Sequence, residues 1–305
     1  VDLDGSNGFV IASDRRRTHV IDEVDAIGDF NADGFTDLIV FSESSISDSQ
    51  VILGHAGDFP ARLDVRLGGE HVFDITKGSG IAFGQRSVSG LGDVNGDGFD
   101  DIFVGGLVSL VPGSEAAAGY VLYGHGGESF PTIVLSTVTS ESGFRVDASG
   151  SIVIIADSAD VNRDGLNDLT VATVAFDDSG SRTGPLADRG VTTSAFVIYG
   201  ETQNRDSVNI FQLDGSDGFE IVHGNANEDV LGPAPVGDIT DDGIDDLVVE
   251  TLIGLQLLPG STESFGAEFQ LPAFGPENDT ERFYPFGFDF NADGIPDGVT
   301  STSPD

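Results

Sequence analysis

The chain lacks cysteine, methionine and tryptophan, and Lys77 is its only lysine. Because there is no cysteine, neither a disulfide framework nor a thiolate metal site can form. Basic residues are scarce as well: 13 lysine and arginine residues stand against 52 acidic ones, which gives a formal net charge of −39. A surface with this charge repels nucleic-acid phosphates and anionic lipid head groups and attracts cations, so we expect no nucleic-acid partner.

Long apolar segments are also missing. The longest apolar runs, such as residues 152–156, are far too short to span a bilayer, so we expect no membrane insertion. Glycine is abundant instead: the 305 residues include 42 glycines and 12 prolines, and 39% are hydrophobic. This composition is typical of many short strands joined by tight turns, in a chain long enough for a sizeable β core.

An aspartate-rich loop recurs five times, at intervals of roughly 50 to 80 residues, and each copy runs into a short apolar segment. The clearest copy is Asp-Val-Asn-Gly-Asp-Gly-Phe-Asp-Asp at residues 93–101. We number these residues as loop positions 1 to 9. Side-chain oxygens then occur at positions 1, 3, 5 and 9, glycine is at position 6, and position 7 offers its carbonyl. A loop that wraps a seven-coordinate calcium ion needs hard oxygen ligands in this arrangement.

The sequence therefore predicts up to five Ca²⁺ sites. The predicted ligands are Asp29, Asn31, Asp33, Phe35 and Asp37 in loop one; Asp93, Asn95, Asp97, Phe99 and Asp101 in loop two; Asp160, Asn162, Asp164, Leu166 and Asp168 in loop three; Asp238, Thr240, Asp242, Ile244 and Asp246 in loop four; and Asp289, Asn291, Asp293, Ile295 and Asp297 in loop five. Three aspartates within nine residues form a like-charge cluster that is costly unless a cation neutralises it. The alternative is an acidic turn whose carboxylates only accept hydrogen bonds from backbone amides.

An EF-hand shares the first nine positions but needs a glutamate at position 12 and a helix on each side. Position 12 is instead a β-forming residue in every copy: Val40, Val104, Val171, Val249 and Thr300. The segments after the loops, such as Leu-Ile-Val at 38–40, favour buried strands. Each loop is therefore expected to enter a strand. Because the loop recurs in every repeat, we expect structural rather than catalytic sites.

Each repeat contains further strand-like segments. A segment with a Gly-Phe or Phe-Gly pair precedes the loop, as at 143–146 and 218–221; a third strand ending in glycine follows the loop strand, as at 120–124; and a fourth comes after it, as at 132–135. Four short antiparallel strands per repeat predict an all-β fold, namely a β-propeller whose blades are the repeats. We place the repeats, within a single domain of residues 1–305, at approximately 8–67, 73–136, 143–214, 218–272 and 283–305.

Four blades and a partial fifth can be distinguished. Residues 1–9 closely match 212–219, so the chain starts within a fourth strand. That strand either completes the last blade and closes the ring, or the chain is part of a longer array such as a seven-bladed propeller. The aspartate loops would share one face of the propeller. Long loops on the opposite face are the predicted ligand-binding region: they lie at 41–50, 105–119 and 173–194.

No catalytic constellation stands out. The chain has no G-x-S-x-G elbow, no H-E-x-x-H pair and no phosphate-binding glycine loop. His55 and His125 follow the glycine of the third strand in matching positions, which indicates a turn feature of the repeat. The only basic cluster, Arg15 to Arg17, is expected to pair with acidic neighbours. We therefore predict no enzyme, no catalytic residue and no organic cofactor site.

The residues Gly92 to Gly105, together with the Phe83-Gly84 pair, resemble the FG-GAP repeat of integrin α-chain propellers and their bacterial extracellular relatives. The resemblance covers nearly the whole chain in five copies. It implies a β-propeller, calcium in the loop between the first two strands of a blade, and a role in extracellular adhesion or ligand binding. Loop four departs from the pattern with Thr240 at position 3, and loop five is followed by a strand with Pro296 and Gly298 around its start.

These observations predict an extracellular or cell-surface adhesion or ligand-binding module stabilised by calcium. Calcium sites of extracellular modules often have dissociation constants of about 10⁻⁴ to 10⁻³ M, so they fill outside cells and stay empty in the cytosol. The expected partner is an extracellular protein or polysaccharide, or a neighbouring domain of a larger surface protein. Two alternatives remain open: a polysaccharide-active enzyme or its accessory domain, and a structural spacer in a surface assembly.

Overall fold

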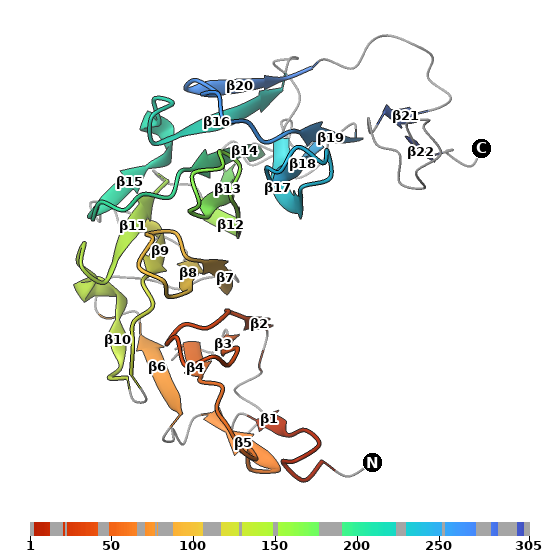
Figure 1. Cartoon of the computed structure of the whole chain (residues 1–305). Helices are drawn as coiled ribbons and strands as arrows, with labels where there is room; N and C mark the ends of the chain where they lie inside the picture. Colours follow the sequence, from red (N-terminus) through yellow and green to blue (C-terminus); the bar gives the residue numbers. More distant parts are fainter. Residues whose placement is uncertain are drawn as a thin grey trace. The chain divides into compact units, whose positions relative to one another are not determined.

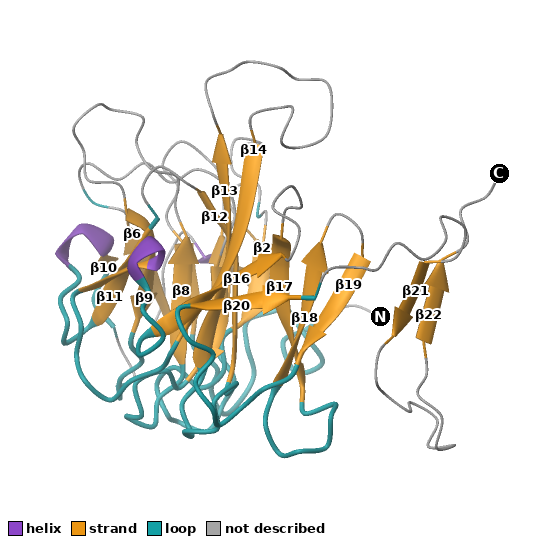
Figure 2. Cartoon of the chain, turned by 90° about the horizontal axis from the view of Figure 1, so that it is seen from above, coloured by secondary structure: helices purple, strands orange, loops and turns teal. Residues whose placement is uncertain are grey.

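The structure is a computed structural model that describes residues 3–12, 21, 23–41, 49–65, 71–76, 78, 88–105, 117–127, 130–148, 152–176, 191–223, 230–251, 254–272, 282–285 and 298–301. This part of the chain consists of β-strands joined by loops and by short 3-10 turns such as η2 (Leu135–Thr137) and η4 (Ile210–Gln212), with no α-helix (Figure 2). The predicted all-β class is confirmed. Within these residues no helix is long and apolar enough to cross a membrane.

The chain divides into two compact units. Unit 1 comprises Val1–Ala156 and Glu201–Asn209, and unit 2 comprises Asp157–Gly200 and Ile210–Asp305. Figure 1 shows the strands of both units as separate small sheets rather than one continuous sheet. We name the larger sheets by their first strand.

Unit 1 contains three sheets among the described residues. The β2 sheet and the β7 sheet each have four antiparallel strands and a short fifth strand added in parallel at the outer edge. In spatial order the β2 sheet consists of β2 (Glu23–Ala26), β3 (Leu38–Phe41), β4 (Ser49–Ile52), β6 (Val72–Thr76) and β10 (Ile133–Val134). The β7 sheet consists of β7 (Val88–Gly92), β8 (Asp101–Gly105), β9 (Ala117–Leu122), β11 (Gly143–Asp147) and β15 (Ser207–Asn209). A parallel pair is formed by β1 (Val10–Ala12) and β5 (Arg62–Asp64).

Unit 2 repeats this plan. The β12 sheet runs in the order β12 (Ile152–Ala159, shared with unit 1), β13 (Asp168–Phe176), β14 (Val191–Ile198), β16 (Gly218–His223) and β20 (Glu268–Leu271), and β20 is again parallel to its neighbour. The β17 sheet has three antiparallel strands, β17 (Val230–Gly237), β18 (Asp246–Thr251) and β19 (Gly254–Leu258). A hairpin pairs β21 (Arg282–Pro285) with β22 (Gly298–Ser301).

The strands after the aspartate loops were predicted correctly, but two other strand assignments are wrong. The Gly-Phe segments at 143–146 and 218–221 do not begin a sheet: as β11 and β16 they pair antiparallel with β9 and β14 and complete the preceding sheet. The predicted fourth strands instead pair in parallel at the outer edge, as β10 and β15 do. A strand pattern shows that a segment is extended but not which neighbour it joins, which explains both errors. Consecutive repeats are thus interlocked through shared sheets.

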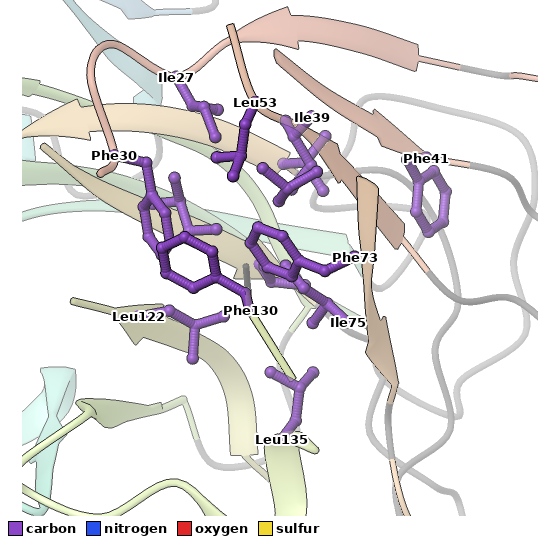
Figure 3. Close-up of a cluster of buried hydrophobic side chains, with 14 residues drawn as sticks. Ile27, Phe30, Ile39, Phe41, Leu53, Phe73, Ile75, Leu122, Phe130 and Leu135 are labelled. Carbon is purple, nitrogen blue, oxygen red and sulfur yellow. The ribbon is translucent and has the colours of Figure 1, made fainter. Parts of the chain in front are cut away.

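The core of unit 1 lies between the β2 sheet and the β7 sheet (Figure 3). The apolar runs of β3 and β8 are almost entirely buried, which is why they show no alternation of polar and apolar residues. Phe30, which belongs to loop one, is fully buried, and its ring centroid lies 6.0 Å from that of Phe73 and 5.6 Å from that of Phe130. The loop is therefore part of the core. In unit 2, side chains from the β12 and β17 sheets form the equivalent core: Val197, Phe219, Ile221, Leu247 and Val249.

Because Phe30 is buried in this core, Phe30→Ala is expected to lower the free energy of unfolding by about 3 kcal/mol or more. Phe35→Ala is a control in the same loop, where the side chain is 41% exposed. That change should cost no more than about 0.5 kcal/mol. Urea unfolding of the two variants tests the difference, and equal losses would show that loop one does not contribute to the core.

Candidate functional site

Four of the five predicted aspartate loops lie within the described residues. Loops one to four connect β2 to β3, β7 to β8, β12 to β13 and β17 to β18. Each one therefore joins the first two strands of its sheet and enters the strand that the sequence predicted after it, but the strand before it is not the predicted Gly-Phe segment. No helix flanks these four loops. Loop five lies outside the described residues, and so do the central parts of the three long loops and the cluster Arg15 to Arg17.

The four described loops share one set of hydrogen bonds. In loop two the Asp93 carboxylate accepts the N–H of Asp97 at 3.2 Å and, on its other oxygen, the N–H of Gly98 at 2.9 Å. Gly98 has a φ of 88°, a left-handed conformation that glycine adopts without strain. The same two bonds form at Asp29, Asp160 and Asp238. A side chain that accepts its own loop amides fixes the tight turn locally.

Positions 3, 5 and 7 continue the same pattern. Asn95 donates its side-chain amide to the Asp97 carboxylate at 2.9 Å, and that carboxylate accepts the N–H of Phe99 at 3.0 Å. The bond from position 7 recurs with Phe35, Leu166 and Ile244 as donors. Loop four differs at position 3, because Thr240 has no side-chain amide to donate to Asp242; its hydroxyl donates to Asp246 instead, at 3.4 Å.

The aspartate at position 9 is fully buried in all four loops. In loop two, one oxygen of Asp101 accepts the N–H of Val94 at the loop start, and the other accepts the N–H of Gly124 after the third strand, both at 2.9 Å. The equivalent pairs of donors are Phe30 and Gly54, Val161 and Gly200, and Ile239 and Gly260. This carboxylate therefore ties the loop to the third strand, a structural role that the sequence analysis did not assign to it.

Burial also changes the acidity of these groups. Desolvation raises the pKa of Asp101 and of Asp168 from the ordinary 3.8 to about 8, and that of Asp37 to about 6. The hydrogen bonds from the backbone act in the opposite direction. Neighbouring carboxylates at positions 1 and 5 raise the pKa further, since like charges disfavour ionisation. A positive charge in the loop would favour the ionised form of the same groups.

The donor chemistry of the loops fits a hard divalent cation. Every side chain at positions 1, 3, 5 and 9 offers oxygen, and calcium prefers carboxylate, amide and carbonyl oxygens. The two ion pairs found in the described part of the chain, Arg145–Asp147 and Arg205–Glu201, leave the loop carboxylates uninvolved. As arranged in the described residues, no three side chains of Asp, Glu or His converge closely enough to hold a metal ion. Calcium binding therefore stays a prediction that rests on donor type and spacing.

Two residues that matter for the loops were missed by the sequence analysis. The carboxylates of Asp100 and Asp245, at position 8, accept the N–H of Asp29 and Asp160 in the preceding loop. Their signal in the sequence is the Asp-Asp doublet at positions 8 and 9, which loops two and four have and the others lack. The two repeat histidines pack on aromatic rings: His55 lies 4.2 Å from Phe59 and His125 lies 4.4 Å from Phe130, between ring centroids.

The raised pKa values predict an unusual pH dependence in the absence of calcium. A folded-state pKa above the unfolded value means that the folded protein binds these protons more tightly, so their contribution to stability is lost as pH rises from about 4 to about 8. Urea unfolding in chelator should give a lower free energy of unfolding at pH 8 than at pH 5. High ionic strength is needed to screen the general repulsion between acidic residues, and calcium should reduce the difference. Equal free energies at both pH values would contradict the assigned burial effect.

Comparison with known proteins assigns no family to the chain. No protein-family model matches it, and no curated protein matches it. The resemblance to the FG-GAP repeat therefore rests on the residues of the loops and strands themselves.

Proposed function

We propose that this chain is a calcium-stabilised β-propeller that acts outside the cell as an adhesion or ligand-binding module. The observation that carries the proposal is the aspartate loop, which occurs in four described copies at one place in the sheet and with one hydrogen-bond pattern. A site repeated in four sheets serves the scaffold, because a catalytic site needs only one copy. The ligand would then bind elsewhere on that scaffold.

The propeller arrangement is supported by how consecutive sheets pack within a unit. In unit 1, β2 and β7 approach so closely that a Cβ on Gly90 would overlap the backbone of Ile27. The other face of the β2 sheet is less covered: Val24 is 47% exposed, whereas Val88, at the same place in the β7 sheet, is 4% exposed. A propeller packs every blade between two others. A further blade, from ring closure or from a longer array, would cover this face.

The extracellular setting follows from the chemistry of the proposed metal. Loops with these ligands bind calcium in extracellular modules at about 10⁻⁴ to 10⁻³ M, a concentration reached outside cells. Calcium that binds only the folded state stabilises it by about 2.7 kcal/mol per site at a hundredfold excess over the dissociation constant. The role of the metal would be structural, and the strong negative charge of the chain is compatible with cation binding.

A module of this kind should bind an extracellular protein or a polysaccharide saturably and without turnover. Immobilised extracellular proteins and acidic and neutral glycans, probed with the protein in calcium and in chelator, test this. Binding that is lost in chelator together with the fold is the expected result. Released glycan products would instead favour a polysaccharide-active enzyme, and no saturable ligand would favour a structural spacer.

A further inference from the structure

Loops one and two are joined by a reciprocal pair of hydrogen bonds. The Asp100 carboxylate accepts the backbone N–H of Asp29 at 2.6 Å, and the backbone N–H of Asp100 donates to the carbonyl of Asp29 at 3.3 Å. Asp29 holds position 1 of loop one, and Asp100 holds position 8 of loop two. Gly28 leaves the space for this contact, because a Cβ there would overlap the Asp100 carboxylate. Loop two therefore holds both backbone polar groups of Asp29, the first predicted ligand of loop one, by hydrogen bonds.

The same connection occurs independently in unit 2. The Asp245 carboxylate accepts the N–H of Asp160 at 3.3 Å, and the N–H of Asp245 donates to the carbonyl of Asp160 at 3.3 Å. Ala159 occupies the position that Gly28 has in unit 1. The distance from the aspartate N–H to the carboxylate is longer here, 3.3 Å against 2.6 Å in unit 1. Loops one and three carry Thr36 and Asn167 at position 8, so they have no carboxylate to offer at this place.

A second backbone bond holds the next residue of the earlier loop. His125 donates its N–H to the carbonyl of Phe30 at 3.1 Å in unit 1, and Ser261 donates to the carbonyl of Val161 at 2.8 Å in unit 2. Positions 1 and 2 of the earlier loop are thus both held by the repeat that follows. In that later repeat, Asp100 and Asp245 lie between two predicted ligands, at positions 7 and 9.

We propose that Asp100 and Asp245 are positioning residues that couple the aspartate loops in pairs, one with two and three with four, so that calcium binds the two loops of a pair with positive cooperativity. This inference rests on the proposed calcium function. Ordering the later loop fixes its position 8 carboxylate, which in turn fixes the main chain that carries the first ligand of the earlier loop. Coupling between two binding sites is reciprocal, so ordering the earlier loop helps the later one equally.

Unit 2 offers a matched pair of variants for the test. Asp245→Ala removes the carboxylate that holds Asp160. Asp241→Ala removes the same charge from the same loop at position 4, where the side chain is exposed and the φ is 58°. Loop one has Ala32 at this position with a φ of 53°, so alanine is tolerated there. Asp245→Asn keeps one acceptor oxygen and should behave as an intermediate case, which separates lost positioning from failure to fold.

Isothermal titration of the full chain with calcium, after chelation, measures the coupling. Asp242→Ala removes a predicted ligand of loop four and should weaken calcium binding at loop three by about fivefold or more, the lower end of typical coupling. In the Asp245→Ala background that effect on loop three should vanish, whereas in the Asp241→Ala background it should persist. Calcium binding with the same affinity at loop three in all backgrounds would overturn the coupling and leave the proposed function intact.

Amide hydrogen exchange in chelator supplies a readout that needs no calcium. The amide of Asp160 should exchange faster in Asp245→Ala than in Asp241→Ala, because only the first variant loses its acceptor. Equal exchange would overturn the proposed link. If the titration shows no calcium binding to the unmodified chain, the proposed function and the cooperativity both fail, and that outcome is distinct from uncoupled binding.

Discussion

The carboxylate at position 9 of each aspartate loop is the interaction on which the described structure depends. It is buried, and its two oxygens join the N–H at the loop start to the N–H that follows the third strand. The two backbone N–H donors are buried with it, and leaving either of them unsatisfied inside the protein would be costly. One side chain therefore fixes the loop, the entry into the second strand and the end of the third, in each of four sheets.

The aspartate loops, whose residues keep the same spacing in every copy, could be predicted from the sequence, whereas the pairing between strands could not. The loops and the strands after them, such as 38–41, could be predicted because aspartate spacing and an apolar run are local signals. The first strands β2 and β7 were missed because they contain polar residues or glycine and show no apolar run. The parallel partners at the sheet edges and the contact of Asp100 with Asp29 join residues far apart in the chain, and no local pattern reports such contacts.

The net negative charge of the chain and the burial of the position 9 aspartates both make it unfavourable to keep these aspartates ionised. Desolvation raises the pKa values of Asp101 and Asp168, and like charges within each loop raise them further. Divalent cations in five loops would supply ten positive charges against the net charge of −39, leaving about −29 on the protein. Calcium would thus neutralise the like-charge clusters of the loops specifically, while the remaining acidic residues stay on a solvated surface or reflect a saline medium.

Thermal unfolding in calcium, in excess chelator, and in chelator with high sodium chloride tests the central claim most directly. Sodium chloride screens exposed charges but cannot replace a divalent ion bound among carboxylates. The account predicts a large fall in melting temperature in chelator that calcium reverses and sodium chloride does not. A melting temperature that ignores calcium and follows ionic strength alone would show that the loops are acidic turns held only by their own backbone amides, and the calcium-dependent module would be contradicted.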